Sequence, residues 1–157
     1  MAICFLEGSA ITVPGGTTLV ENLRVGDDVS LPNGGTLKVT FIGKQSFDLV
    51  TTPEAHPITI DTNSIAEGVP NKPLHLSAKH GVWNDRDWFR AEQLANGHSI
   101  SLMDNPPSIS HYYNIGLEEW AAVLAHNLSC ESYRDLGNRN EFHFSTQTPG
   151  QSLKLVG

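Results

Sequence analysis

A chain of 157 residues with 39% apolar and 17% charged residues has the composition of one globular domain, which excludes a disordered or a membrane-embedded protein. Its net charge of −7 leaves no basic face for phosphate groups and excludes nucleic acid as a partner. We expect no membrane span, no secretory signal and, with two cysteines, no disulfide scaffold.

Short β-type runs, each closed by turn residues, recur through the first half of the chain. We expect strands at residues 11–13, 17–20, 29–31, 36–43, 47–51 and 58–60. Residues 14–16 mark a turn, and Asn33-Gly34 predicts the positive φ angles of a primed hairpin turn. Residues 21–28 fit a brief helical turn or a loop.

The second half continues in the same way around one long loop. The loop covers residues 61–73 and is rich in Asn, Gly, Ser and Pro, with one helical turn expected at 64–67. Further extended runs are expected at residues 74–83, 88–90, 98–102, 112–117, 127–133 and 142–144, and one helical turn at 91–94. Many short strands at intervals of about 8–12 residues, with little helix, indicate an all-β domain.

The residues that could carry chemistry stand in three places. Cys4 lies almost at the start, Ser77 and His80 are three residues apart near the middle, and Cys130 lies near the end. Taken alone, each has an ordinary interpretation, since free cysteines are mostly small buried hydrophobes and a Ser-x-x-His pair at a strand end is mostly structural. His56 belongs to a connecting loop in this interpretation. No spacing of His, Cys, Asp or Glu matches a metal-ligand pattern, so we expect no metal and no cofactor.

Taken together, these motifs resemble the Hint superfamily, the autoprocessing domains of hedgehog proteins and inteins. The resemblance is strongest to bacterial Hint domains that lack intein splice-junction residues. The similar segments are the Cys-Phe block at residues 4–11, a "V-E-x-L-x-x-G-D-x-V" signature at 20–29, a Thr/Ser-x-x-His block at 76–82, an "A-x-x-L-x-x-G" segment at 91–97 and a closing segment at 131–139. The resemblance implies a flattened, horseshoe-like all-β fold with short helical turns, whose two termini meet at a central cleft. It assigns residues 1–140 to the processing domain and 141–157 to an extension of it.

The chemistry implied by this resemblance is an N–S acyl shift. The Cys4 thiol attacks the carbonyl of Ile3, and a positive neighbourhood is expected to favour the thiolate. The Cys4 nitrogen must gain a proton as its bond breaks; we assign His80 as general acid, and Ser77 to hold the scissile amide or the oxyanion. Asn114 is a weaker candidate, near where inteins carry an assisting aspartate, and an amide cannot transfer protons.

The chain departs from splicing inteins and from hedgehog domains at named positions. His126-Asn127 is similar to an intein junction, but Leu128 follows it and thirty residues come after, so splicing is not expected. Gly43 occupies the place expected for the aspartate that activates cholesterol in hedgehog domains, which disfavours sterol transfer. Cys130 is expected near Cys4, as a small core residue, a resolving thiol or a redox partner.

The function expected from this resemblance is autocatalytic cleavage through a Cys4 thioester, with the upstream polypeptide as its substrate. Water would release that polypeptide, and an external amine or thiol would ligate it. The alternative is a Hint-shaped domain without activity that serves as a structural or interaction module. The compartment stays open, with a secreted or cell-surface precursor as one alternative.

Overall fold

A computed structural model describes residues 3–133 and 144–145 of the chain. The strands are β1 (Phe5–Leu6), β2 (Ala10–Val13), β3 (Gly16–Leu19), β4 (Asp28–Ser30), β5 (Thr36–Asp48), β6 (Ile58–Ile60), β7 (Leu74–Leu76), β8 (Gly81–Trp83), β9 (Trp88–Arg90), β10 (Ile100–Leu102), β11 (Ile109–Leu117), β12 (Ala122–Ala125), β13 (Leu128–Glu131) and β14 (Phe144–Ser145). The helical segments are the 3-10 turns η1 (Val20–Asn22) and η2 (Pro53–Ala55) and the α-helix α1 (Ala91–Leu94). The predicted all-β class is confirmed.

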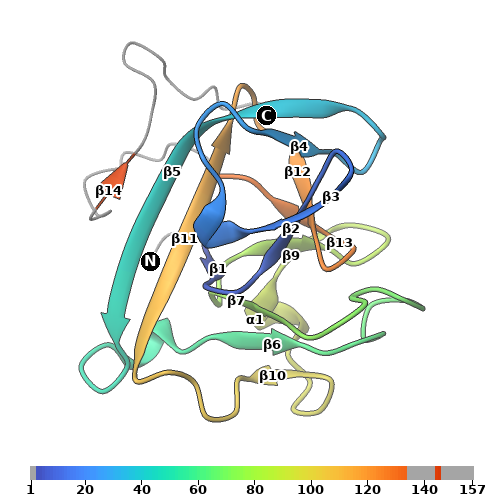
Figure 1. Ribbon diagram of the computed structural model, residues 1–157. Coiled ribbons are helices and arrows are strands. Elements are labelled where there is room, and N and C mark those ends of the chain that lie inside the picture. The colour runs from blue at the N-terminus through green and yellow to red at the C-terminus, as the bar shows by residue number, and fades with distance from the viewer. Residues whose placement is uncertain (1–2, 134–143, 146–157) are drawn as a thin grey trace.

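The described strands form two antiparallel sheets (Figure 1). The first sheet has the order β10-β6-β7-β1-β11-β5-β14, with β4 beside β5. The second sheet has the order β3-β2-β12-β13-β8-β9. No helix among the described residues is long and apolar enough to cross a membrane. Residues 134–139 of the closing motif and most of the predicted extension at 141–157 lie outside the described part of the chain.

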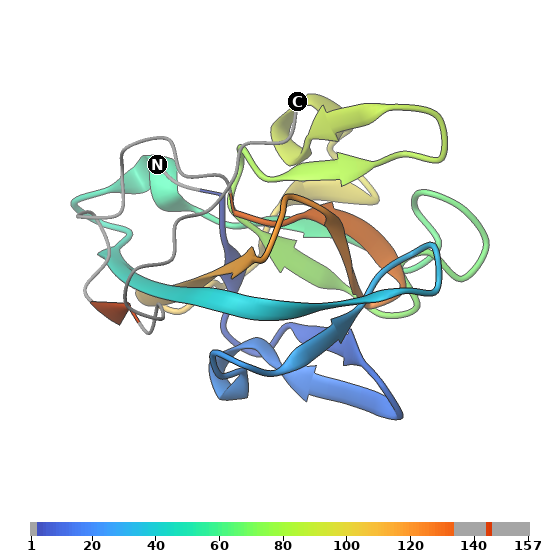
Figure 2. The same cartoon turned by 90° about the horizontal axis from the view of Figure 1, so that it is seen from above.

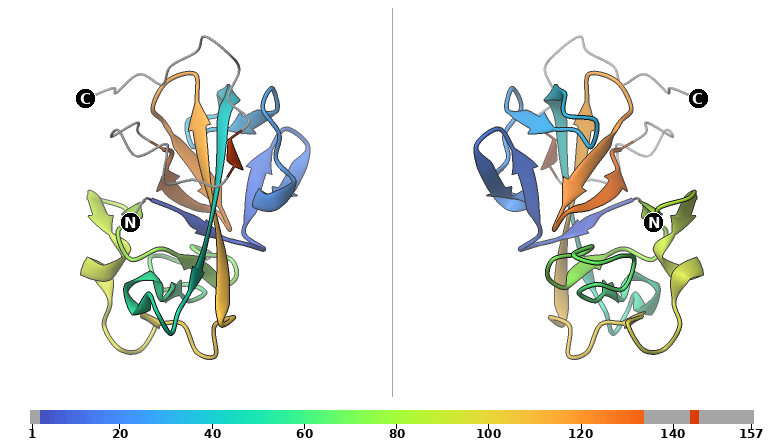
Figure 3. Two further views of the ribbon diagram at one scale, coloured as in Figure 1. Left: turned by 90° about the vertical axis from the view of Figure 1, so that its left-hand side faces the viewer. Right: turned by 90° about the vertical axis from the view of Figure 1, so that its right-hand side faces the viewer.

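The first sheet is built around the long antiparallel pair of strands β5 and β11. The two strands stay paired from Ile109 opposite Asp48 to Leu117 opposite Val39. Figures 2 and 3 place the β2–β3 hairpin and the β8–β9 hairpin on opposite sides of this pair. The sequence predicted a break between residues 43 and 47, which was wrong. The polar residues there remain in the strand because their backbone groups are bonded to β11.

Two of the turns at which the chain crosses between the two sheets build the site. The first crossing leads from β1 to β2 through residues 7–9, and the second leads from β7 to β8 through residues 77–80. β1 lies between β7 and β11, with Phe5 opposite both Leu76 and Tyr113. The start of the chain is therefore held between the β7–β8 crossing and the middle of β11.

The core consists of two clusters of buried side chains. The larger one lies between the sheets and includes Ile11, Ile60, Leu76, Val82 and Leu128. The smaller one is made of Cys4, Leu6, Phe41, Ala55, Tyr112 and Tyr133. Alternate positions of a strand face opposite sides of the sheet, so Cys4 and Leu6 share one face and Phe5 packs on the other. The smaller cluster surrounds the first cysteine.

Two predicted turns differ in the structure. Gly34 has the expected positive φ of 92°, but Asn33 does not, so the turn between β4 and β5 is not a primed two-residue turn. Pro32 fixes its own φ near −65°, which favours an ordinary turn, closed here by the bond from Gly34 N to Leu31 O. The helical turn expected at residues 64–67 is also absent from the described structure, since Ala66 and Val69 form a β-bridge there.

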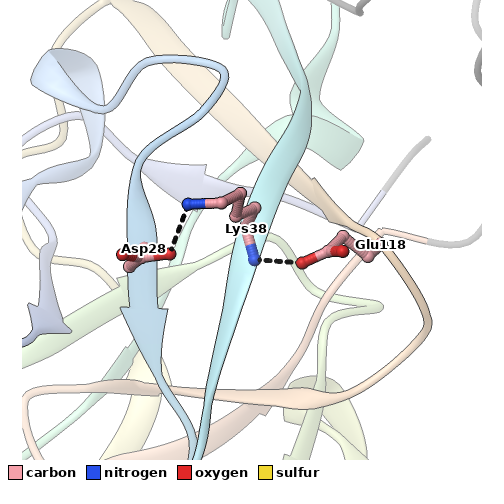
Figure 4. A network of polar contacts seen from close by, with 3 residues as sticks. All are labelled: Asp28, Lys38 and Glu118. Atoms are coloured by element: carbon pink, nitrogen blue, oxygen red, sulfur yellow. Dashed lines mark hydrogen bonds and ion pairs between the residues drawn. The ribbon is translucent and has the colours of Figure 1, made fainter.

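A small surface network joins three segments away from the core (Figure 4). Lys38 in β5 forms an ion pair with Asp28 in β4 at 3.1 Å. The backbone N–H of Lys38 donates to Oε1 of Glu118 at 2.8 Å, beyond the end of β11. Both acidic partners are exposed, so the network adds little to the free energy of folding and mainly aligns the three segments.

Candidate active site

Cys4 lies immediately before β1 and is completely buried. Its thiol belongs to the smaller cluster, beside Leu6, Phe41, Tyr112 and Tyr133. The side chains packed with it in this cluster are apolar or aromatic, and the positive neighbourhood expected from the sequence stays a prediction. The amide nitrogen Nδ2 of Asn114 lies 3.7 Å from Cys4 Sγ and supplies a polar contact inside the cluster.

The peptide bond between Ile3 and Cys4 is held at both ends by side chains. At its oxygen end, Asn114 Nδ2 donates a hydrogen bond to the Ile3 carbonyl. At its nitrogen end, the Cys4 N–H donates to Ser77 Oγ at 2.9 Å. A β-like bond from Ser77 N to Cys4 O, 3.0 Å long, anchors the residue after this peptide. The carbonyl oxygen and the N–H of this one peptide bond are therefore each hydrogen-bonded to a buried side chain.

The β7–β8 crossing presents Ser77 and His80 together. The bond from His80 N to Ser77 O, 3.1 Å long, closes a four-residue turn between the two sheets. Both residues are buried: Ser77 is completely buried, and His80 is 1% exposed. Because β7 pairs with β1, this turn lies directly beside Cys4. The structure thus brings all three predicted site residues together.

His80 lies between two backbone carbonyl groups. Its Nδ1 is 3.0 Å from Cys4 O, and its Nε2 is 2.9 Å from Glu131 O. The Phe5 ring packs edge-on against the imidazole at 4.5 Å. Burial lowers the pKa of His80 to about 4, although both carbonyl contacts act in the opposite direction. A neutral ring donates from one nitrogen only, so a single N–H faces the two carbonyl oxygens.

Asn114 occupies the middle of β11, opposite Gly43 of β5, and is 2% exposed. The sequence contained a signal for it, since an amide within the otherwise apolar run of residues 112–117 must find a buried partner. No feature of the sequence indicates the contact of His80 with Glu131. It uses a backbone oxygen, which any residue at position 131 would provide.

The second cysteine belongs to the other cluster. Cys130 pairs with Val82 across β13 and β8 and packs in the larger core. No disulfide bond joins Cys4 to Cys130. Burial raises the pKa of the Cys130 thiol, whose Sγ donates to Leu128 O at 3.5 Å. Of the roles considered for Cys130, this placement fits a small core residue.

The His126-Asn127 pair forms the turn of the β12–β13 hairpin. Both residues have positive φ, 48° and 69°, as a two-residue primed turn requires. The His126 ring accepts a bond from Ala10 N at 3.1 Å through Nε2 and lies 3.0 Å from Pro73 O through Nδ1. His56 likewise has a structural contact, 2.8 Å from Met103 O. These contacts tie loops and strands together.

No group of three or more His, Cys, Asp or Glu side chains suited to a metal ion is found in residues 3–133. One hollow, of about 490 Å³, is lined by residues 21–25 together with Ile42, Lys44 and Tyr113. By strand alternation these last three side chains face away from Asn114, so this hollow lies on the other side of the sheet from Cys4.

Comparisons with known proteins agree with this architecture. A model of a family described as Hint domain matches residues 3–137. The solution structure of a bacterial intein-like domain from Clostridium thermocellum aligns with a TM-score of 0.54 and 14% identity, over 82% of this chain and 97% of that chain. The crystal structure of a DnaB intein from Synechocystis sp. PCC 6803 aligns with a TM-score of 0.59 and 10% identity, over 85% of this chain and 100% of that chain. No curated protein matches the sequence. At these identities the likeness to the two structures concerns the fold.

Proposed function

The chain belongs to the Hint domain family, and from this premise we propose that it processes its own polypeptide by an N–S acyl shift at the Ile3–Cys4 peptide bond. The observation that carries the proposal is that both polar groups of this peptide bond are hydrogen-bonded to side chains. Asn114 donates to the Ile3 oxygen, and Ser77 accepts from the Cys4 nitrogen. A buried hydrogen-bond donor aimed at a peptide oxygen beside a buried thiol is the arrangement that acyl transfer needs.

The first step is the attack of Cys4 Sγ on the Ile3 carbonyl carbon. As the tetrahedral intermediate forms, negative charge develops on the Ile3 oxygen, to which Asn114 already donates. In buried surroundings such a bond strengthens as charge develops, and it requires no reorganisation. The C–N bond then breaks and its electron pair passes to nitrogen, which gains a proton while the Cys4 thiol gives one up; we assign His80 as the general acid for this proton. The nitrogen leaves as an amine, and Ile3 remains attached to Cys4 through a thioester.

The second step consumes the thioester. Water gives a free carboxylate on the upstream polypeptide, and an external amine or thiol gives a ligated product. Cys4 is completely buried, so the rate at which this nucleophile enters is expected to govern the fate of the thioester. The upstream polypeptide is the substrate in both cases.

The experiment is to fuse a small folded protein ahead of Ile3 and to follow the fusion by intact mass with and without hydroxylamine. We expect a cut between Ile3 and Cys4 that hydroxylamine accelerates and that Cys4→Ala abolishes. The matched control is Cys130→Ala, which removes the other fully buried thiol and should cleave like the wild type. An uncut fusion over days, with folding verified and Cys4 reduced, would refute the proposal and leave an inactive module of this fold.

A further inference from the structure

The hollow on the other side of the sheet from Cys4 has a volume of about 490 Å³, within the range of about 300–1,000 Å³ that is usual for small-molecule sites. One wall is formed by the β5–β11 pair and the other by residues 21–25. Figure 1 shows this second segment, which begins at the blue helical turn η1 after β3, beside β11. Backbone bonds of 2.8 Å from Gly26 N to Val39 O and from Val39 N to Asp27 O attach the end of the segment to β5. The two walls are therefore fixed relative to each other.

Part of the lining is apolar and continuous with the core. Leu23, Ile42 and Tyr113 are buried members of the larger cluster, and Val25 packs against that cluster. These four side chains line the hollow from both walls. Apolar surface of this kind gains free energy when an apolar ligand covers it.

Two cations line the same hollow. Lys44 Nζ lies 5.8 Å from the centroid of the Tyr113 ring, a cation–π distance that places the ammonium group over this aromatic wall. Arg24 has an acidic neighbour in Asp27, but that carboxylate accepts from the backbone N–H of Arg24 at 2.9 Å. Within the described part of the chain, neither Arg24 nor Lys44 forms an ion pair. Both positive charges therefore lack an acidic partner there.

The acidic group in the lining is Glu21, whose Oε1 accepts from Gly8 N at 2.9 Å. Two cations and one carboxylate leave the lining with one net positive charge. The chain as a whole has 17 acidic residues against 10 Lys and Arg, so its composition does not account for this local excess. A single negative charge on a ligand would neutralise the excess.

We propose that this hollow binds a small organic acid that carries one carboxylate on an apolar body. The carboxylate lies against Arg24 and Lys44, since Arg can donate two parallel N–H bonds to a carboxylate and Lys adds a point charge. The apolar body covers Leu23, Val25 and Ile42. A phosphate monoester fits less well, because it carries about 1.5–2 negative charges near pH 7 and would exceed the single positive charge of the lining.

The first arm of the test measures binding to the 157-residue chain by isothermal titration calorimetry, with octanoate as the probe. We expect saturable binding with a Kd below about 1 mM, which is within the bounds for a ligand of ten non-hydrogen atoms. Hexanoate should bind about 15-fold more weakly, because each buried CH₂ contributes about fourfold. Octylammonium has the same chain with the opposite charge and should bind at least tenfold more weakly. Equal affinity for octylammonium, or no saturable binding of octanoate, would overturn the proposal.

The second arm removes the two cations. Hydrogen bonds to charged groups contribute enough for the double variant Arg24→Gln, Lys44→Gln to bind octanoate at least about tenfold more weakly, and it should lose the preference over octylammonium. The matched control is Lys38→Gln, which removes an exposed cation from the same strand outside the hollow. It should bind within twofold of the wild type. A double variant that is folded by circular dichroism and binds octanoate like the wild type would overturn the proposal.

Lys44→Arg keeps the charge and should keep the binding, so it still provides an answer if the double variant unfolds. Amide shifts in ¹H–¹⁵N spectra should move on titration with octanoate at residues 21–25, 42–44 and 113. Shifts confined to other segments would place the ligand elsewhere and overturn the proposal. Cys4→Ala should bind octanoate like the wild type, because the hollow lies on the other side of the sheet. Failure of the acyl shift and failure of this site are therefore observed separately.

Discussion

Asn114 donates a hydrogen bond to the carbonyl oxygen of Ile3, although the two residues are 111 positions apart in the chain. The bond joins the middle of β11 to Ile3, two residues before β1, and pairing of Phe5 with Tyr113 in the same sheet brings the two together. An amide at this place keeps a neutral donor on the oxygen at any pH near neutrality. This contact makes Asn114 the residue best placed to stabilise an oxyanion.

Replacing Asn114 with alanine is expected to slow cleavage of the upstream fusion by about 10²–10³-fold, because one oxyanion donor is lost. Asn114→Asp should not restore the rate, since an ionised carboxylate accepts hydrogen bonds and repels a developing oxyanion. The measurement is the rate of product formation by intact mass in hydroxylamine. A folded Asn114→Ala protein within threefold of the wild-type rate would contradict this role.

The stability of the protein is expected to fall below about pH 6.5, in part through His126. The ring accepts a bond from Ala10 N, so it must be neutral, and burial followed by the charge of Lys72 lowers its pKa from 6.5. The unfolded chain therefore binds more protons than the folded one as the pH falls. The stabilisation is complete above pH 6.5 and is lost as the pH falls toward the folded pKa.

Urea denaturation at several pH values from 7.5 to 5 measures this effect. His126→Asn removes the titrating ring and keeps a residue that tolerates positive φ. The free energy of unfolding of the variant should depend less on pH than that of the wild type. His75 and His80, whose pKa values burial also lowers, continue to contribute in both proteins. Identical pH dependence in the two proteins would exclude His126 as a contributor.

Cys130→Ala is expected to lower the free energy of unfolding by about 1 kcal/mol, the usual effect of a small change in a packed core. The cleavage rate should stay unchanged, because Cys130 packs in the larger cluster and contacts Leu128 O. Urea denaturation and the fusion assay measure the two quantities. A tenfold slower cleavage in a folded Cys130→Ala protein would show that this thiol takes part in the reaction.

Tyr112→Phe is expected to reduce the free energy of unfolding by about 1–3 kcal/mol, since it leaves a buried carbonyl without its donor. The Tyr112 hydroxyl donates to Ala55 O at 2.5 Å, and burial together with the nearby Cys4 raises the pKa of the phenol. Tyr113→Phe is the control on the neighbouring position, whose ring faces Lys44. Equal effects of the two substitutions would refute the importance of the Ala55 bond.

Local patterns in the sequence were sufficient for the class of the fold and for most of the strands. Gly15 and Gly97 have the positive φ angles expected of turn glycines, and α1 coincides with the predicted turn at 91–94. Local patterns failed where pairing with a distant strand decided the outcome. β5 continues past residue 43 because β11 satisfies its backbone along the whole length, and no feature within residues 43–47 could reveal that partner.

The sequence by itself determined that this is a mostly β chain of the Hint type, with Cys4, Ser77 and His80 as the residues to examine. Only the tertiary structure decided which atom each one contacts: the Ser77 hydroxyl on the Cys4 nitrogen, the His80 ring between two carbonyls, and Asn114 on the Ile3 oxygen. The physical reason is that motifs specify residue types through local spacing. Hydrogen bonds between distant segments depend on strand register and on the direction of each side chain, and these exist only in the folded molecule.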